Sequence, residues 1–420
     1  MTSRVGNGRN DVDTHRNFPI NEIQTTRLKS TISGQSNFEL NLTNLGHKMI
    51  QRIYIHNYRC FENFDLTIGS GTSSVLVIGK NGSGKSSLID ALRMIQSIAR
   101  GDNRIRQFLK KEDFAFDRLD VPIRIEITAD LDGQKFDYGL AFEFPSNFQE
   151  PKIKEEFLKA DGQNVFTRQE AEVSLAGGSA SFLVDWHVVA LPVVQLKGAD
   201  NPIEKFRSWI AKAVLIAPVP PDIEEESEVD SLEPTERVRN FADWFSGVLS
   251  EFPASYSTIE SFLKKIMPDF LDFQNKTVGE STKRIVVRFQ KGDRIYKTGL
   301  SRLSDGEKMF FVTAVLLAAN KHLGPMVCFW DEPDNFVGLS EVGQMTMELR
   351  KSFKSSGRGQ IFVTSHNPEA IRKFSDESTL CLTRVSHLEP TRGRWLSDMD
   401  QNGDLINSLI RGDLLDAAGE

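Results

Sequence analysis

The alternation of apolar and polar residues predicts the first ordered elements of the chain. From Met49, the run MIQRIYIHNY alternates like a half-buried strand, and a second such run, FENFDLTI, begins at Phe61. The short break between them predicts a hairpin. The apolar run SVLVIG, a glycine-rich segment and the helically spaced run SSLIDALRMIQSIA follow in that order. This stretch therefore predicts a strand, a glycine loop and a helix.

The middle of the chain has a less regular pattern. Alternating runs begin at Ile123 and Phe136, and Asp132-Gly133 between them favours a second hairpin. Residues 146–282 combine possible strands with helix-like runs such as IEKFRSWIAKA and FADWFSGVLSEF. An acidic, proline-bearing stretch at 218–236 separates these two runs and predicts a surface linker or lid, with a disordered loop as the favoured description. No heptad pattern persists, which argues against a long coiled coil.

Clearer signals return at about residue 283. They are a strand (RIVVRF), a helix (EKMFFVTAVLLAANKHL) and two buried strands (MVCFW and IFVTS). We therefore divide the chain into four parts: a polar N-terminal tail (1–48), an N-terminal lobe (49–145), an inserted, helix-rich lid or arm (146–282) and a C-terminal lobe (283–420). A soft prior of about 150 residues per domain allows two to three domains.

Composition narrows the class of protein. The net charge of −7 argues against a nucleic-acid coat held by bulk positive charge, although a local basic patch stays open. No apolar run approaches the ~20 residues of a membrane helix, and the first residues lack the apolar core of a secretory signal. Cys60, Cys328 and Cys381 are widely spaced, which suggests neither a disulfide framework nor a zinc site. These features predict a cytoplasmic protein without a membrane segment.

The glycine segment matches the phosphate-binding pattern G-x-x-x-x-G-K-[ST] between a strand and a helix, the context that this pattern requires. Its backbone N–H groups and the helix N-terminus would surround phosphate oxygens. Lys85 would contact the β- and γ-phosphates of ATP, and the Ser86 hydroxyl would ligate Mg²⁺. The alternative is a chance glycine turn. The predicted ATP-binding residues here are Gly79, Lys80, Asn81, Gly82, Ser83, Gly84, Lys85, Ser86 and Ser87.

Two adjacent carboxylates follow the buried strand MVCFW. In enzymes with a phosphate loop, the first carboxylate after such a strand supports Mg²⁺, which here is Asp331. Glu332 would then lie beside the γ-phosphate and orient or deprotonate the attacking water. An acidic turn after a core strand is the alternative interpretation.

Two further motifs flank these carboxylates. Leu303-Ser304-Asp305-Gly306-Glu307 opens the long apolar helix, with Ser304 as its N-cap and a possible anion site. By itself this is an ordinary capped helix. His366 follows the strand IFVTS and would hydrogen-bond the γ-phosphate or hold the attacking water, although a lone histidine is more often structural.

The order GKNGSGKSS, LSDGEK, CFWDEP and TSH resembles the ABC-type ATPases of the RecF, SMC and OLD-like branch. The opening IYIHNYRCFENFDL is similar to the amino-terminal hairpin of that branch. In this resemblance Arg59 corresponds to an arginine that helps to hold the nucleotide, and a surface hairpin arginine is the alternative. The resemblance covers roughly residues 49–145 and 283–385.

The resemblance implies an α/β fold: an ABC-type ATPase head with a mixed sheet, an antiparallel β-subdomain and helices. It also implies a head-to-tail dimer or higher homo-oligomer with ATP and Mg²⁺ at shared sites, where Lys85, Glu332 and His366 serve catalysis. One subunit would close over the ATP of its partner with Ser304, Asp305, Gly306 and Glu307. Asp305 departs from the family pattern, which has glycine there. The glutamine that contacts Mg²⁺ in the family is not obvious, and Gln107 is our candidate.

Two functional classes remain open. The chain resembles the ATPase component of two-gene anti-phage systems such as PARIS or Septu, which implies a nucleotide switch that controls an effector. The 54 residues after His366 are fewer than the order of 100 that a Toprim nuclease domain needs. We therefore expect a Toprim-like or HNH-like nuclease on another chain.

The second class is a RecF-like clamp that binds DNA in repair or recombination. It rests on a basic cluster near the phosphate-loop helix, for which a solvated surface is the alternative. The cluster comprises Arg100, Arg104, Arg106, Lys110 and Lys111. An ABC transporter subunit is a third, weaker interpretation.

Overall fold

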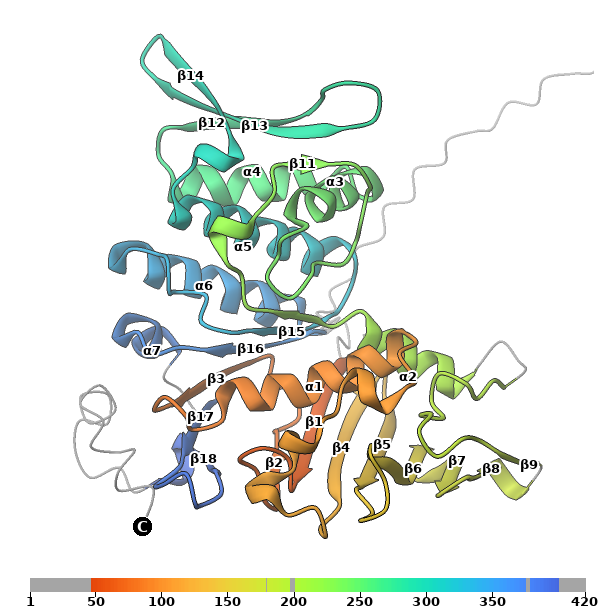
Figure 1. Cartoon of the computed structure of the whole chain (residues 1–420). Helices are drawn as coiled ribbons and strands as arrows, with labels where there is room; N and C mark the ends of the chain where they lie inside the picture. Colours follow the sequence, from red (N-terminus) through yellow and green to blue (C-terminus); the bar gives the residue numbers. More distant parts are fainter. Residues whose placement is uncertain (1–46, 179, 197–200, 375–377, 400–420) are drawn as a thin grey trace, which may run out of the picture. The chain divides into compact units, whose positions relative to one another are not determined.

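The computed structural model describes residues 47–178, 180–196, 201–374 and 378–399 (Figure 1). Most of the predicted N-terminal tail, up to residue 46, lies outside these residues. The described residues form three sheets and seven α-helices.

Eight strands form an antiparallel sheet in the order β2-β1-β4-β5-β6-β7-β8-β9. They are β1 (Lys48–His56), β2 (Phe64–Thr67), β4 (Ile123–Leu131), β5 (Gln134–Glu143), β6 (Lys152–Ala160), β7 (Gln163–Gln169), β8 (Glu172–Leu175) and β9 (Ser181–Leu183). The pairing of β1 with β2 confirms the first predicted hairpin. β4 and β5 are joined by Asp132 and Gly133, whose φ values of 61° and 83° suit a two-residue hairpin turn, so the second hairpin is confirmed too.

Strands β6–β9 differ from the expected helix-rich lid or arm, because they extend the antiparallel sheet that begins with β1 and β2. The alternation in this region is masked by two buried ions, Glu156 on β6 and Arg168 on β7, whose side chains are both 0% exposed and 3.8 Å apart. Glu156 also accepts hydrogen bonds from the backbone N–H groups of Ala190 and Leu191. Because their charges and hydrogen-bonding groups are paired, these two residues can occupy core positions. A hydrophobicity pattern would instead assign charged residues to the solvent-exposed face.

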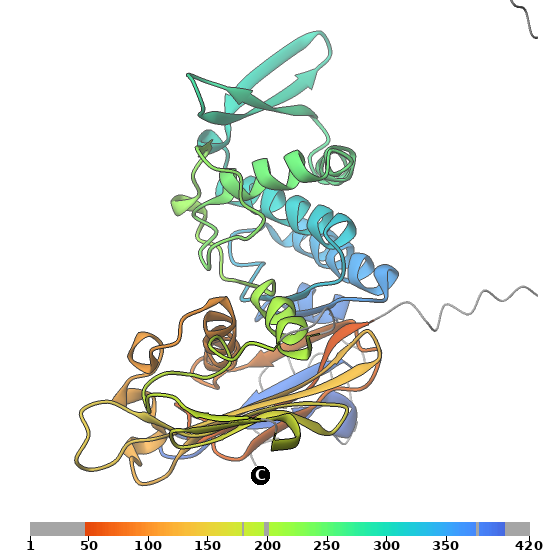
Figure 2. The same cartoon turned by 90° about the vertical axis from the view of Figure 1, so that its right-hand side faces the viewer.

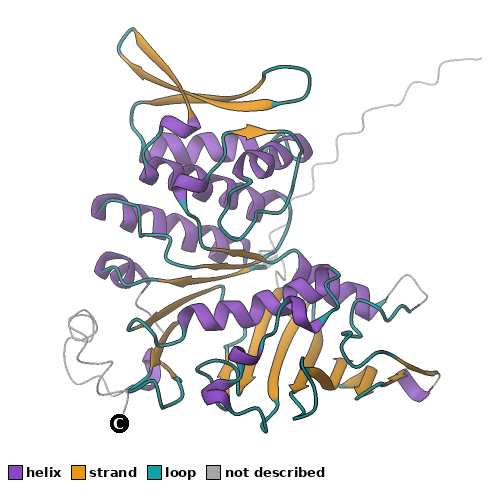
Figure 3. Ribbon diagram, viewed as in Figure 1, coloured by secondary structure: helices purple, strands orange, loops and turns teal. Residues whose placement is uncertain are grey.

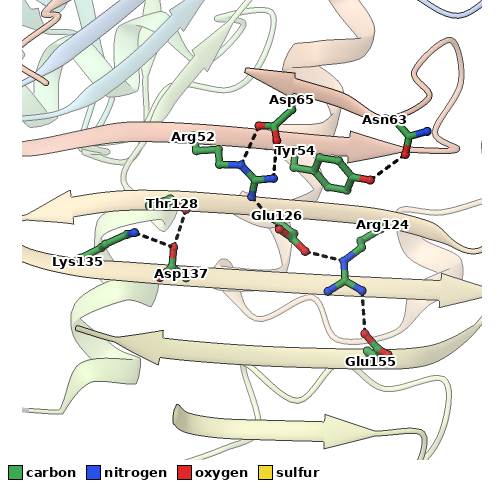
Figure 4. A network of polar contacts seen from close by, with 10 residues as sticks. All are labelled: Arg52, Tyr54, Asn63, Asp65, Arg124, Glu126, Thr128, Lys135, Asp137 and Glu155. Atoms are coloured by element: carbon green, nitrogen blue, oxygen red, sulfur yellow. Dashed lines mark hydrogen bonds and ion pairs between the residues drawn. The ribbon is translucent and has the colours of Figure 1, made fainter. Parts of the chain in front are cut away.

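The other face of this sheet carries a network of ion pairs, which Figure 4 shows from close by. Arg52 on β1 donates to Asp65 near 2.8 Å and to Glu126 at 2.9 Å. Arg124 on β4 donates to Glu126 at 2.6 Å and reaches across β5 to Glu155 on β6 at 2.8 Å. Half-exposed pairs of this kind contribute little each. The network therefore marks the solvent face of the sheet, and the apolar residues on its opposite face build the core.

A second sheet has six strands in the order β10-β15-β16-β3-β17-β18, of which the first five are parallel. They are β10 (Val214–Ile216), β15 (Val327–Trp330), β16 (Gln360–Thr364), β3 (Ser74–Gly79), β17 (Thr379–Thr383) and the antiparallel edge strand β18 (Arg392–Trp395). The parallel strands β15, β16, β3 and β17 are buried throughout, as expected for a sheet covered on both faces. Their carboxyl ends meet at one edge.

Helices cover the sheets. They are α1 (Lys85–Arg100), α2 (Pro202–Ala211), α3 (Phe241–Glu251), α4 (Ser255–Ile266), α5 (Asp305–His322), α6 (Leu339–Ser356) and α7 (Pro368–Phe374). α1 and α2 lie together along the apolar face of the eight-stranded sheet (Figure 3). Phe206 on α2 packs against Phe136 and Tyr138 of β5 with ring centroids 6.1 and 5.4 Å apart.

α5 is apolar on all sides and is buried continuously from Lys308 to Asn320, so it forms the centre of a second core. Beyond α3 and α4 lies a ribbon of β11 (Glu226–Ser227), β12 (Phe270–Thr277), β13 (Lys283–Lys291) and β14 (Arg294–Gly299). In Figures 1 and 2 this ribbon and the six-stranded sheet lie on opposite sides of the helices. The predicted α/β class, with a mixed sheet and an antiparallel β-subdomain, is confirmed.

The acidic stretch 218–236 is not the disordered loop that its composition suggests. The carbonyl of Pro220 accepts from Lys308 Nζ at 3.1 Å. Glu236 pairs with Arg93, and Glu233 pairs with Arg100, each at 3.0 Å. The two arginines on α1 thus neutralise part of its charge and Lys308 on α5 holds its backbone, which explains why an acidic segment folds against the protein.

Candidate functional site: a phosphate-loop pocket

The phosphate loop connects β3 to α1 at the carboxyl edge of the parallel sheet. Gly82 and Gly84 have φ values of +80° and +102°, which glycine adopts without strain. A Cβ at Gly84 would lie 2.8 Å from Cys60 Sγ, so the close approach also requires glycine. Lys85 opens α1, and its Nζ donates to the carbonyl of Gly79 at 2.9 Å. The chain therefore folds locally into a compact loop with a fixed ammonium group.

β15 delivers the two carboxylates to the same edge. Asp331 and Glu332 follow Trp330, the last residue of the strand. Ser86 Oγ donates to Asp331 Oδ2 at 3.2 Å, although the two residues are 245 positions apart. The predicted magnesium ligands Ser86 and Asp331 are therefore neighbours in the fold.

Thr364, at the end of β16, links both carboxylate residues. Its Oγ1 donates to Asp331 Oδ1 at 2.5 Å and accepts from the backbone N–H of Glu332 at 2.8 Å. Glu332 has a φ of +50°, an uncommon conformation that this contact helps to hold. Asn335 Nδ2 donates to Glu332 Oε2 at 2.5 Å. Sequence reasoning identified the motif of Thr364 but not its role, because that role depends on the pairing of β15 with β16.

His366 lies beside Glu332, with Nε2 3.4 Å from Glu332 Oε1. Burial lowers the pKa of His366 below its usual 6.5, and the nearby Lys85 ammonium lowers it further, against the opposing effect of the carboxylates. Burial also lowers the pKa of Lys85, although Glu332 and Asp331 oppose this shift. The imidazole is therefore held neutral near pH 7, and it can accept a proton or orient a water.

A pocket of about 320 Å³ opens over the phosphate loop. Its lining comprises Arg59, Cys60, Asn81, Gly82, Gly84, Lys85, Ser86, Ser87, Glu332 and Arg384. Arg384 was missed by the sequence analysis. It follows β17, which lies next to β3 in the sheet, and its Nε donates to the carbonyl of Glu389 at 3.0 Å. The same loop reaches the phosphate loop through Thr391 Oγ1, which donates to the carbonyl of Ser83 at 2.9 Å.

Arg59, for which the resemblance implies a contact with the nucleotide, lies on the pocket wall. Its Nε donates to Asp113 at 2.9 Å, and its Nη1 is paired with Asp90 on α1. Two carboxylates therefore hold the guanidinium at the mouth of the pocket.

Ser304, Asp305, Gly306 and Glu307 do not line this pocket. Ser304 caps α5 and accepts from the Glu307 N–H at 3.3 Å, while Glu307 accepts from the Ser304 N–H at 2.8 Å. Ser304 and Asp305 are exposed. A Cβ at Gly306 would lie 3.0 Å from the carbonyl of Phe336, so this helix start touches the segment that follows Glu332.

Gln107 is not brought to the pocket either. It closes a short 3₁₀ turn, Ile105–Gln107, in which its Oε1 accepts from the backbone N–H of Arg104 at 3.1 Å. This turn follows the far end of α1, whose 16 residues separate it from Ser86 by about 24 Å. Gln107 is therefore not placed to contact a metal at Ser86.

Comparison with known proteins finds one family model that matches part of the chain. Residues 49–174 match the family model of an AAA ATPase domain. The match includes the phosphate loop and the strands up to β8, and it supports an ATPase domain in this part of the chain. None of the curated proteins compared with the chain matches it significantly in sequence.

Solved structures of SMC heads are similar in fold. An SMC head bound to the C-winged helix domain of ScpA has 13% identity and a TM-score of 0.49, over 83% of this chain and 98% of that one. The SMC head domain from Thermotoga maritima has 13% identity and a TM-score of 0.46, with the same coverage. An SMC head from Pyrococcus furiosus with an extended coiled coil, bound to the C-terminal domain of ScpA, has 12% identity and a TM-score of 0.48, over 89% and 100%.

Two further observations concern the described residues as a whole. None of their helices is both long and apolar enough to cross a membrane. They also contain no group of three or more histidine, cysteine or acidic side chains arranged to hold a metal ion.

Proposed function

We propose that the protein binds ATP at the phosphate loop and hydrolyses it to ADP and phosphate. One observation carries this proposal: five polar side chains converge at the edge of one sheet where three parallel strands end. Lys85 and Ser86 open α1 after β3, Asp331 and Glu332 follow β15, and His366 follows β16. Open α/β sheets bind ligands at this edge. The match of residues 49–174 to an AAA ATPase domain supports the same activity.

The residues present suit Mg²⁺. A hydroxyl and a carboxylate 3.2 Å apart, Ser86 Oγ and Asp331 Oδ2, are oxygen donors of the kind that Mg²⁺ takes together with substrate phosphates. When bound, Mg²⁺ would neutralise charge that develops on the phosphate oxygens. Thr364 fixes the carboxylate of Asp331 from the opposite side.

Each protein group then has a defined task. The Lys85 ammonium binds the β- and γ-phosphates and leaves its contact with Gly79 to do so. Arg59 and Arg384 bind the nucleotide from the pocket rim. Glu332 orients the attacking water and accepts its proton, and neutral His366 positions the water or the γ-phosphate.

We further propose that the site is completed by a second copy of the chain. Ser304 and Asp305 are exposed at the N-terminus of the long helix α5, outside the lining of their own phosphate-loop pocket. They would close over ATP held by a partner, together with Gly306 and Glu307. ATP then favours the closed dimer in proportion to its higher affinity for that state.

Such a nucleotide-dependent switch is suited to the control of another protein. We propose that it assembles with an effector, a Toprim-like or HNH-like nuclease, in cytoplasmic anti-phage defence. The support is the resemblance of the motif set to the ATPase component of two-gene defence systems. Recovery of a nuclease with the complex from its native host supports this role, and recovery of the ATPase without one counts against it.

A DNA clamp is the second candidate function, because three residues of the basic cluster are exposed and could contact DNA phosphates. Arg106, Lys110 and Lys111 are exposed and form no ion pair within the described residues, whereas Arg100 is paired with Glu233. Binding through such residues weakens steeply with salt. A mobility-shift titration at low salt in which ATP produces no DNA binding would remove this candidate.

The ATPase proposal is tested with Glu332→Gln, which keeps the shape of the side chain and removes the base. We expect retained ATP, a stabilised oligomer and turnover reduced by about 10²- to 10⁴-fold. Glu280→Gln is the matched control, since Glu280 is exposed and distant from the pocket, and its turnover should stay unchanged. Normal turnover in Glu332→Gln would show that Glu332 is not the base.

A further inference from the structure

A larger cavity, of about 720 Å³, lies away from the phosphate loop, between α4 and the carboxyl-terminal parts of α5 and α6. Its walls include Gly324 and Pro325, just before β15, and Arg358, just before β16. It therefore lies at the amino ends of the parallel strands, whereas the phosphate-loop pocket lies at their carboxyl ends. Figure 1 shows α4, α5 and α6 as neighbouring helices in this part of the molecule.

The walls of this cavity, here called the α4–α6 cavity, are strongly basic. Lys265, Lys321, Lys351 and Arg358 line it together with a single acid, Glu348. Glu348 is paired with Lys265. The other three cations form no ion pair within the described residues. Unpaired cations around a concavity attract a ligand with more than one negative charge.

Hydroxyl and amide groups complete the lining. Thr258, Ser261 and Ser352 contribute hydroxyl groups from two of the three helices. Asn320 on α5 is only 3% exposed, and its Nδ2 donates to Ser352 Oγ at 3.1 Å. Its Oδ1 is buried and has no hydrogen-bond partner within the described residues. A buried acceptor without a partner is costly unless the site serves a polar ligand.

We propose that the α4–α6 cavity binds a small molecule that carries phosphate. Lysine and arginine bind phosphate through charge-assisted hydrogen bonds, and serine and threonine hydroxyls suit its remaining oxygens. A concave site of this volume fits a metabolite better than a nucleic-acid duplex, which prefers an extended basic surface.

The position of the cavity also links it to the proposed ATPase, and this step rests on the proposed function. α5 carries Ser304 at its start and reaches the cavity at its end, about 27 Å away over 18 residues. α6 follows the segment that begins with Glu332 and also ends at the cavity. Because closely packed helices move as rigid bodies, a ligand that shifts these helix ends would shift Ser304 and the loop after Glu332.

Binding to the α4–α6 cavity is tested in a variant whose phosphate loop lacks its phosphate-binding lysine. The full-length Lys85→Ala variant, with an unchanged thermal unfolding midpoint, is titrated calorimetrically with inorganic pyrophosphate. We expect saturable binding that becomes about tenfold weaker or more when Lys351→Ala and Arg358→Ala are added. Lys354→Ala with Arg392→Ala removes the same charge outside the cavity and should leave the affinity unchanged. Absent binding, or equal weakening by both pairs, would overturn the site.

The coupling is tested by ATP turnover at saturating ATP, where pyrophosphate no longer competes at the phosphate loop. We expect pyrophosphate to change the turnover of the unsubstituted chain and to leave that of Lys351→Ala with Arg358→Ala unaltered. Binding without any effect on turnover would overturn the coupling. A chain that does not hydrolyse ATP would contradict the proposed function, while the titration would still decide whether the cavity binds phosphate.

Discussion

Thr364 Oγ1 lies 2.5 Å from Asp331 Oδ1, so a hydroxyl at the end of β16 fixes the carboxylate at the end of β15. The same hydroxyl accepts from the N–H of Glu332 and thereby sets the proposed base beside the proposed metal ligand. The relative position of the two acidic residues thus depends on the parallel pairing of these strands.

Loss of this hydroxyl should affect both stability and turnover. Thr364→Val leaves the partly buried Glu332 N–H without this acceptor, which should lower the free energy of unfolding by about 0.5–1.5 kcal/mol. Turnover should fall about 10- to 100-fold because Asp331 and Glu332 lose their alignment. Thr379→Val is the matched control: Thr379 is equally buried, but its hydroxyl has no hydrogen-bond partner among the residues that the structure describes. Denaturant unfolding and steady-state ATPase assays measure both effects, and similar losses in the two variants would refute the role of Thr364.

If the ATPase site is shared between two subunits, mixing two different inactive variants should restore one working site in each mixed dimer. Lys85→Ala removes the phosphate contact, and Ser304→Arg blocks the start of α5. In an equal mixture, half of the dimers contain one intact site, which gives roughly a quarter of the normal turnover. A mixture of Lys85→Ala with Glu332→Gln should stay inactive, because both residues serve the same pocket. Full activity of Ser304→Arg alone would contradict a shared site.

Arg384 should contribute to nucleotide affinity although no sequence motif contains it. It lines the phosphate-loop pocket from the loop after β17. Arg384→Ala should raise KM for ATP about tenfold, because it removes a charge-assisted contact, with a smaller change in kcat. Arg392→Ala, on the neighbouring strand β18 but outside the pocket, should leave KM unchanged. An equal rise in both variants would indicate a general charge effect.

His366 predicts a pH dependence of stability. Burial lowers its pKa in the folded protein below the 6.5 of an unfolded histidine. As the pH falls below 6.5, the unfolded chain therefore binds a proton before the folded chain does, and the free energy of unfolding decreases. When the pH is lowered from about 7.5 to about 5.5, the free energy of unfolding of His366→Gln should therefore decrease less than that of the unsubstituted chain. Urea unfolding measures this difference, and the exposed His387→Gln should behave like the unsubstituted chain.

Much of the site could be predicted from local sequence. The strand, glycine loop and helix around Lys85, and the carboxylates after a buried strand, follow from short-range patterns because each depends on neighbouring residues. The two hairpins also follow from alternation, and at Asp132-Gly133 from the special backbone angles of the turn.

Other features depend on residues distant in the chain. The sequence alone did not reveal that β6 and β7 extend the first sheet, because Glu156 and Arg168 are charged residues that satisfy each other in the core. Gln107 was only a candidate for the family's glutamine, which is not obvious in the sequence, and the turn after α1 holds it away from the pocket.

The sequence by itself determined the phosphate loop, the paired carboxylates and the strands that precede them, since each is encoded within a few consecutive residues. Only the tertiary structure decided that Thr364 orients Asp331, that Arg384 reaches the phosphate loop, and that a basic cavity lies at the far ends of α5 and α6. These relationships arise from strand order and helix packing, which bring together side chains that no local pattern connects.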